Sequence, residues 1–402
     1  MITATYIKAI KPTPTTIPGY IAMPSIWDQL KPLTPGQQEM LDALRNKNYE
    51  IVGFFGPTGT GKSLFSLAYG IQSVIDNEYQ RFIIIKPVVD VVTGEEITIT
   101  KSPEAFMEAV KSYVQDVIGP FIGWEKIEEL IKQNKIVFAD SRFLRGRTFD
   151  ESIVFLDDIQ LMKAESIIEA VVRVGRNSRL IVAGDPVFQA LREVQQDPAA
   201  LIREVLLSEE KSRVVDLGIK DIVREGAKRG IRLLLEYKMR ARPLSEEEKK
   251  IYDVMKAKAP DADIVTVLDI VGTKQQFEIT SEHVPDALIV VKQGHLGRLV
   301  GRGGERINAA EQELGKRLRG VELNLDFKDL VRAVHPTPWI WKHIEEIDFA
   351  GPSLQIKVYD DVIGAMVGQR GVYVRFLDSV FRKLLGIGVR VVAVERPRPR
   401  KK

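Results

Sequence analysis

A glycine-rich turn directly after a short apolar run constrains this chain more than any other feature. The run is Ile51–Phe55, and the turn has the residues Gly56, Pro57, Thr58, Gly59, Thr60, Gly61, Lys62 and Ser63. This order fits the pattern G-x-x-x-x-G-K-[ST], and a helix is expected after it over residues 62–76. A strand, a glycine-rich loop and a helix in that order predict a phosphate-binding loop.

The residue types of this loop define the ligand that we expect. Glycines let successive backbone N–H groups curl around a polyphosphate, and the N-terminus of the following helix adds a positive partial charge. Lys62 is suited to reach the β and γ phosphates, and the hydroxyl of Ser63 is suited to hold Mg²⁺. Residues 56–63 therefore predict binding of a nucleoside triphosphate, with ATP and Mg²⁺ as the cofactors.

Length and composition limit what else the chain can be. Its 402 residues exceed what one hydrophobic core usually supports, so two or three domains are expected. Cysteine is absent and histidine occurs four times, which argues against disulfides and structural zinc. We see no apolar stretch of membrane-spanning length and no secretory signal, and we therefore expect a cytoplasmic protein without a membrane partner.

The pattern from residue 33 onward is that of an α/β fold. Apolar runs at 51–55, 82–86, 153–156 and 179–183 are continuous rather than alternating, as in a parallel sheet with helices on both faces. We expect a P-loop NTPase with a mostly parallel sheet covered by helices, followed by two smaller α+β domains. The expected boundaries are a proline-rich arm or small cap at 1–32, the P-loop domain at 33–258, two domains at 259–330 and 331–395, and a basic tail at 396–402.

A second nucleotide motif ends one of these strands. The apolar residues 153–156 are followed by Asp157 and Asp158. In P-loop enzymes the first acid of such a pair coordinates Mg²⁺, and the second polarises the attacking water. We expect these roles for Asp157 and Asp158. Because the side chain of Asp158 is shorter than the more usual Glu, the identity of the catalytic base stays open.

Two glutamines are candidates for contacts with the nucleotide. Gln189 follows the apolar run 179–183 and the residues Gly184, Asp185 and Pro186, where a polar side chain can contact the γ-phosphate or its water. A simple turn is the alternative interpretation of that segment. Gln37, at the start of a helix expected over 36–46, is a candidate to bond the adenine edge through its amide.

The region of about residues 33–240 resembles the PhoH family of helicase-like P-loop ATPases. The resemblance is carried by Gly36-Gln37, the loop 56–63, Lys86-Pro87, the segment 144–149, the segment 155–160, Gly184-Asp185-Pro186 with Gln189, and the segment 221–224. The chain departs from the family pattern at three residues, with Asp158 in place of Glu, Lys86 in place of the usual Arg and Glu225 in place of the usual His. The spacing to Gln189 is also one residue longer. The resemblance implies ATP hydrolysis, a homo-oligomeric ring such as a hexamer, and translocation on RNA or its unwinding.

A ring of this kind needs an arginine that neutralises charge on the transferring phosphoryl group. Arg224, in the segment Asp-Ile-Val-Arg, is the first candidate for nucleotide sensing, and Arg147 is the second. Further arginines near motifs or expected strand ends are Arg142, Arg145, Arg176 and Arg179. For any one of them an ordinary surface position is the alternative.

Residues beyond 259 contain an internal repeat. Each unit has the order strand, helix, G-x-x-G, helix, strand, with equal helix lengths expected in the two units: Ala287–Val291, Glu305–Leu318 and Val321–Leu325, then Leu354–Val358, Val372–Leu385 and Val389–Val394. The two loops are Gly301, Arg302, Gly303 and Gly304, and Gly368, Gln369, Arg370 and Gly371. The units resemble KH domains, with a layout similar to the tandem KH module of the transcription factor NusA. This implies that each loop admits a sugar–phosphate backbone beside a groove for about four unpaired nucleotides.

The charge distribution is compatible with a polyanionic partner, and an ordinary solvated surface is the alternative interpretation of its mild basic excess. Residues 271–402 contain 22 Lys and Arg against 16 Asp and Glu, and the tail is basic. We therefore predict an ATP-hydrolysing, RNA-binding enzyme, an RNA translocase or helicase that couples Mg-ATP hydrolysis to movement on single-stranded RNA; single-stranded DNA satisfies the same contacts. Two alternatives stay open: an ATP-gated RNA-binding switch or assembly chaperone without unwinding activity, and an ATPase whose KH units only support oligomerisation.

Overall fold

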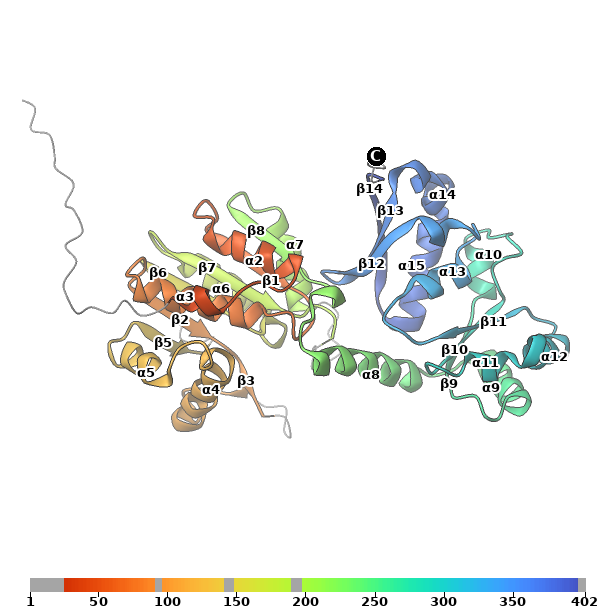
Figure 1. Ribbon diagram of the computed structural model, residues 1–402, viewed down its shortest axis with the longest axis horizontal. Coiled ribbons are helices and arrows are strands. Elements are labelled where there is room, and N and C mark those ends of the chain that lie inside the picture. Colours follow the sequence, from red (N-terminus) through yellow and green to blue (C-terminus); the bar gives the residue numbers. More distant parts are fainter. Residues whose placement is uncertain (1–24, 91–95, 141–147, 189–196, 397–402) are drawn as a thin grey trace, which may run out of the picture.

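The computed structural model describes residues 25–90, 96–140, 148–188 and 197–396. They form an N-terminal α/β unit and a C-terminal part with two small sheets, and the long helix α8 (Glu225–Ala241) runs between them (Figure 1). Among the described helices, none combines the length and the hydrophobicity needed to cross a bilayer.

Six parallel strands form the main sheet of the α/β unit, in the order β5-β2-β6-β7-β1-β8. Their bounds are β1 (Ile51–Phe55), β2 (Arg81–Ile85), β5 (Ile136–Ala139), β6 (Ser152–Leu156), β7 (Arg179–Gly184) and β8 (Ser212–Asp216). The central strands β6 and β7 are buried along their whole length, which explains their continuously apolar sequences. The predicted fold class is confirmed. Strand β8, which the sequence analysis did not predict, forms the edge of the sheet next to β1.

Helices cover both faces of this sheet, and each face forms its own apolar core with the helices that pack on it. On one face, α1 (Ile26–Gln29), α2 (Pro35–Arg45), α3 (Lys62–Ile75), α4 (Pro103–Ile118) and α5 (Trp124–Lys132) share one core. On the other face lie α6 (Ala164–Arg173) and α7 (Pro198–Leu207). A short hairpin of β3 (Val88–Val89) and β4 (Glu96–Ile97) precedes α4. Because Ile26 and Leu30 are buried in the first core, α1 packs onto the α/β unit.

The C-terminal part contains two α+β units with the same sheet topology. After α9 (Glu246–Lys258), the first unit has β9 (Ile264–Asp269), α10 (Val271–Gln276), β10 (Ala287–Val291), α11 (Leu296–Val300), α12 (Glu305–Leu314) and β11 (Leu318–Glu322). The second has α13 (Lys328–Val334), β12 (Ile344–Ala350), β13 (Ser353–Tyr359), α14 (Ile363–Val367), α15 (Val372–Leu385) and β14 (Gly388–Val394). In each sheet the middle strand pairs antiparallel with the first strand and parallel with the last.

The two units differ in the length of the helix after G-x-x-G. Helix α12 has 10 residues and α15 has 14, so the prediction of equal helix lengths was wrong. The cause is Gly315, which ends α12 in the left-handed conformation with φ 64°. Strand β11 consequently begins at Leu318, three residues earlier than the pattern indicated.

An apolar core joins α8 to both small sheets. Ile231, Leu235 and Met239 of α8 belong to the same buried cluster as Val290 of β10 and Leu384 of α15. The two α+β units and α8 are therefore held together by buried apolar surface.

Candidate nucleotide-binding site

The loop 56–63 lies at the carboxyl edge of the parallel sheet, between β1 and α3. Gly61 precedes α3 with φ 96°, a conformation that favours glycine. Gly56 has a different reason, because a Cβ there would overlap the carbonyl oxygen of Leu217. Both glycines are thus required by the backbone path of the loop and by its contact with the segment after β8.

Lys62 is buried in the centre of this loop. Its Nζ donates to the carbonyl oxygens of Gly56 (2.7 Å) and Pro57 (2.8 Å), and Thr60 Oγ1 donates to Pro57 O at 2.9 Å. Burial lowers the pKa of Lys62, although the carboxylates of Asp185, Asp158 and Asp157 oppose that shift. The loop is closed around its own lysine.

Ser63 and Asp157 meet at the same edge of the sheet. Ser63 Oγ donates to both carboxylate oxygens of Asp157, each at 3.0 Å. The carboxylate also accepts from Lys86 Nζ at 3.2 Å and from the Tyr113 hydroxyl, and Asp157 is almost fully buried. The structure thus brings together two residues that stand 94 positions apart.

Lys86 and Tyr113 form the electrostatic surroundings of the acid pair. Burial would lower the pKa of Lys86, but Asp157 and Asp158 outweigh it and raise that pKa. Burial, with the adjacent Asp157, raises the pKa of Tyr113 well above its ordinary value. Burial would raise the pKa of Asp158, yet the bonded ammonium of Lys86 brings it below its ordinary value. Near neutral pH Lys86 therefore carries an ammonium, Asp158 a carboxylate and Tyr113 a neutral phenol.

The donor set fits Mg²⁺ that arrives with a nucleotide. Within the described ranges no group of three or more His, Cys, Asp or Glu side chains is arranged to hold a metal. Mg²⁺ in nucleotide sites is bound by one or two protein oxygens together with waters and phosphate oxygens. Ser63 and Asp157 supply that number of ligands.

A polar chain connects the acid pair to the end of β7. Gln160 Nε2 donates to Asp158 Oδ1 at 3.2 Å, and Gln160 Oε1 accepts from Asp185 N at 3.0 Å. Asp185 is buried, which raises its pKa, and its Oδ1 accepts from the backbone N–H groups of Val187 and Phe188. Asp185 thus organises the start of the loop after β7.

Gln37 and Arg224 both contact the P-loop. Gln37 Nε2 donates to Thr60 O at 3.1 Å, and Gln37 Oε1 accepts from Leu33 N at 2.8 Å. Both ends of the amide are thereby bonded to the backbone, so Gln37 braces the loop in this conformation. Arg224 Nη2 lies 3.4 Å from Thr58 Oγ1.

The other predicted residues fall into three groups. Arg176 is exposed in the segment between α6 and β7. Gln189, Arg142, Arg145 and Arg147 lie outside the described residues. Arg179 is fully buried and donates to the carbonyl oxygens of Ala43, Leu44 and Asn46 at the end of α2. Its candidacy as a phosphate-neutralising arginine was wrong, because its guanidinium caps a helix C-terminus.

The two G-x-x-G loops share one backbone conformation. Gly301 and Gly368 have φ/ψ of 79°/173° and 72°/172°. At the third position Gly303 has 63°/15° and Arg370 has 50°/26°, and both fourth-position glycines are left-handed. Arg302 stands at the second position and Arg370 at the third, so the two arginines are not equivalent.

Family models match two regions of the chain. A model described as PhoH-like protein matches residues 29–236, which is more than half of the chain. The chain belongs to the PhoH-like family. A second model, described as KH domain, matches residues 264–334, the region from β9 to α13.

Individual relatives agree with the family match. A PhoH-like protein from Synechocystis sp. is 27% identical over 191 residues, covering 47% of this chain and 56% of that protein. A PhoH-like protein from Bacillus subtilis is 26% identical over 194 residues, covering 48% and 59%. The chain thus spans somewhat more than half of the length of these relatives.

Similarity to solved structures is weak. The crystal structure of APE1850 is 26% identical with a TM-score of 0.26, covering 38% of this chain and 100% of that one. The large terminase of a thermophilic bacteriophage is 14% identical with a TM-score of 0.31, covering 50% and 48%. Scores this low carry no functional argument.

Proposed function

We propose that this PhoH-like protein hydrolyses ATP with Mg²⁺ and couples hydrolysis to movement on single-stranded RNA. The main support for ATP hydrolysis is the hydrogen bonding of Ser63 Oγ to both carboxylate oxygens of Asp157, at 3.0 Å each, beside the P-loop lysine. In P-loop enzymes Mg²⁺ takes two protein ligands. One is the hydroxyl that follows the P-loop lysine, and the other is a carboxylate at the carboxyl end of a nearby strand of the sheet.

Each residue of the site has a role in this proposal. Lys62 binds the β and γ phosphates, after its ammonium leaves the carbonyls of Gly56 and Pro57. Ser63 and Asp157 hold Mg²⁺, which supplies neutralisation of phosphate charge. Asp158 orients the attacking water, and Gln160 fixes its carboxylate. Arg224 senses the nucleotide next to Thr58.

Three further residues keep the roles expected from the sequence. We assign Gln37 to the adenine edge in the nucleotide-bound state, Gln189 to the γ-phosphate or its water, and Arg147 to neutralisation of phosphoryl charge.

The two G-x-x-G loops support nucleic-acid binding. Equal backbone angles and equal sheet topology support a KH domain in the second unit as well as in the matched first unit. Glycines there leave room for a sugar–phosphate backbone, and Arg302 and Arg370 add positive charge. Single-stranded RNA is the proposed partner, with DNA as the other strand that fits. A homo-oligomeric ring, such as a hexamer, would supply a further arginine to each site.

An ATP-gated RNA-binding switch is the second candidate. The Asp158 carboxylate is bonded to Lys86 and to Gln160, and the ammonium of Lys86 lowers its pKa. A weakly basic, engaged carboxylate favours slow hydrolysis. Separation of a duplex that requires ATP hydrolysis would support the translocase and contradict the switch.

The test is ATP hydrolysis by the full chain and its variants. Lys62→Ala and Asp157→Asn are each expected to lower the rate about 100-fold or more, whereas Lys132→Ala on the exposed end of α5 serves as the control. Unchanged hydrolysis in both site variants would contradict the assignment. In parallel, fluorescence anisotropy with a single-stranded RNA oligonucleotide should show weaker binding by Arg302→Asp/Arg370→Asp; equal binding would remove the loops from the proposal.

A further inference from the structure

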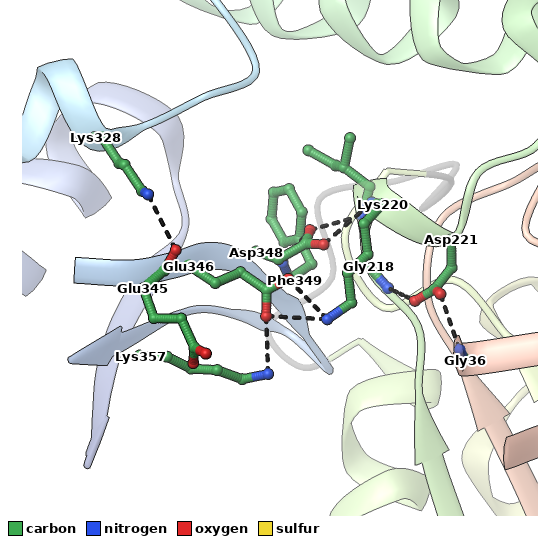
Figure 2. A network of polar contacts seen from close by, with 11 residues as sticks. Gly36, Gly218, Lys220, Asp221, Lys328, Glu345, Glu346, Asp348, Phe349 and Lys357 are labelled. Carbon is green, nitrogen blue, oxygen red and sulfur yellow. Dashed lines mark hydrogen bonds and ion pairs between the residues drawn. The ribbon is translucent and has the colours of Figure 1, made fainter. Parts of the chain in front are cut away.

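Strand β12 ends against the turn that follows β8. Asp348 of β12 accepts from the backbone N–H groups of Ile219 (2.6 Å) and Lys220 (3.1 Å), and Lys220 Nζ bonds both oxygens of Glu346 (Figure 2). Lys357 of β13 also donates to Glu346, at 2.8 Å. The 3-10 turn η3 (Ile219–Asp221) is thus bonded to the edge of the second α+β unit.

The same segment packs on the P-loop from its other side. Leu217 N donates to Phe55 O at 2.7 Å, and Val223 N donates to Gly59 O at 3.2 Å. A Cβ at Gly59 would stand 2.6 Å from the Cβ of Ala227, which shows how closely the two segments approach. Residues 217–227 therefore contact the phosphate-binding loop directly.

Asp221 fixes the shape of this segment. Its two carboxylate oxygens accept from Gly36 N (3.1 Å) and Gly218 N (3.0 Å), as Figure 2 shows. The side chain is buried, so a displacement of the segment at Gly218 is opposed by a bond to α2. Asp221 thus holds Gly218 and η3 in one fixed shape, so a shift of the P-loop would displace η3 as a unit.

A second contact reaches the loop after β7. Phe349, the neighbour of Asp348, packs edge-on against Phe188 with ring centroids 5.0 Å apart. Phe188 N is bonded to Asp185 Oδ1 at 2.9 Å, and Asp185 is the carboxylate that most strongly opposes the lowered pKa of Lys62. Two adjacent residues of β12 therefore touch both segments that flank the nucleotide site.

Beside this ring contact, the joint is polar. A cleft of about 230 Å³ lies along it, and its charged lining residues include Glu39, Asp216, Lys220, Glu346, Lys357 and Arg390. Charged groups regain hydration when such a contact opens, so the polar contacts add little to the cost of opening. Phe188, Ile222 and Phe349 at this joint belong to the apolar cluster around α8, so opening would also expose apolar surface. The polar contacts between β12 and η3 are the part of the joint that can exchange with water.

We infer that the joint between β12 and η3 couples nucleotide occupancy of the P-loop to docking of the second α+β unit. The inference rests on the proposed nucleotide binding and does not require RNA binding. A phosphate at Lys62 replaces the bonds from its ammonium to Gly56 and Pro57, which shifts the loop against residues 217–223. Because coupling between two sites is reciprocal, docking of β12 in turn changes nucleotide affinity.

Hydrogen–deuterium exchange of the full chain tests the inference, with and without ADP–Mg²⁺ or a non-hydrolysable ATP analogue with Mg²⁺. Nucleotide is expected to protect residues 56–63 and to change exchange at 219–220 and 344–350 by about fivefold or more. In Asp348→Ala the response at 344–350 is expected to disappear, while protection at 56–63 remains. Asp378→Ala is the matched control, because Asp378 accepts from Val389 N within the same unit, away from the joint.

A second, more conservative variant keeps the inference testable if Asp348→Ala fails to fold. Phe349→Leu keeps an apolar side chain, and it should reduce the response at 344–350 without loss of secondary structure measured by circular dichroism. An unchanged exchange pattern at 344–350 in the wild type, with residues 56–63 protected, would overturn the inference. A full response in both variants would also overturn it. Absent protection at 56–63 would contradict the proposed nucleotide binding as well, whereas failure to bind RNA would leave this result untouched, since the experiment contains no RNA.

Discussion

In the first α+β unit the outer face of the sheet is apolar, whereas in the second unit it is polar. Val291 and Val358 both stand ten residues before the first glycine of their G-x-x-G loops, which aligns β10 with β13. Strand pairing then makes three positions equivalent: Leu288 and Gln355, Val290 and Lys357, and Leu268 and Asp348. The first residue of each pair is buried in the core with α8, and the second faces the polar joint with η3.

The difference shows how one topology serves two structural tasks. The inner faces are alike, because Ala287, Ile289 and Val291 pack under α11 and α12 as Leu354, Ile356 and Val358 pack with α14 and α15. The two sheets differ in their outer faces. The first sheet is fixed to α8 by apolar burial. The second meets the α/β unit through hydrogen bonds and ion pairs beside the Phe349–Phe188 ring contact.

The largest expected effect on the unfolding free energy comes from placing a carboxylate on the outer face of the first unit. Leu268→Asp places a carboxylate in an apolar core without a partner, and it should cost at least about 3 kcal/mol of unfolding free energy. Urea denaturation followed by circular dichroism measures this loss. An unfolding midpoint close to that of the wild type would break the comparison between the two outer faces.

The converse change is expected to be milder. Asp348→Leu removes the acceptor of the Ile219 and Lys220 N–H groups but leaves the inner face of the second unit intact. We expect a loss of about 2 kcal/mol, since unsatisfied donors at the joint can regain water. Exchange at these two amides should rise while exchange within β13 stays constant. A collapse of the whole second unit would show that the polar face is part of its core.

The third positions of the G-x-x-G loops provide a smaller contrast. Arg370 holds a left-handed φ of 50°, where the first unit has Gly303. Arg370→Gly should raise the unfolding free energy by about 0.5 to 1 kcal/mol, and Gly303→Arg should lower it by a similar amount. Thermal unfolding measures both. Arg370→Gly should nevertheless bind RNA more weakly, because a positive charge is lost. A stability decrease in Arg370→Gly would contradict the strain argument.

The smallest expected effect is the contribution of Glu346, at the joint between β12 and η3, to the pH dependence of the unfolding free energy. Burial would raise the pKa of Glu346, but Lys220 and Lys357 outweigh it and lower that pKa. The ion pairs are therefore present above the unfolded pKa near 4.3 and are lost as pH falls through the lower folded value. Because the partners are partly exposed, the loss should stay below about 1 kcal/mol. Glu346→Gln should remove this part of the acid dependence, as measured by unfolding between pH 3 and pH 6.

Local motifs allowed much of the α/β unit to be predicted from the sequence. The loop 56–63 and the pair Asp157–Asp158 could be identified because their residues are adjacent in the chain and follow apolar runs. Tyr113 could not, since its contact with Asp157 spans 44 positions and its helix looks like any amphipathic helix. Arg179 was misjudged for the same reason, because the carbonyl oxygens that it bonds lie more than 130 positions away.

The joint between the units was likewise hidden. Asp348 accepts from residues 128 and 129 positions earlier, and no periodicity in either segment indicates that contact. The alternation of polar and apolar residues in β13 was visible, but it also fits a solvent-exposed face. Only the three-dimensional arrangement separates a docking face from an ordinary solvated one.

The most direct test of the account is steady-state ATP hydrolysis by the full chain, titrated with single-stranded RNA. We compare the wild type with Arg302→Asp/Arg370→Asp, and with Lys132→Asp/Lys250→Asp as a control that reverses two exposed charges elsewhere. We predict that RNA stimulates the wild type and the control, and that the loop variant keeps its basal rate but loses the stimulation. Equal rates with and without RNA in the wild type would contradict coupling between the P-loop site and the G-x-x-G loops.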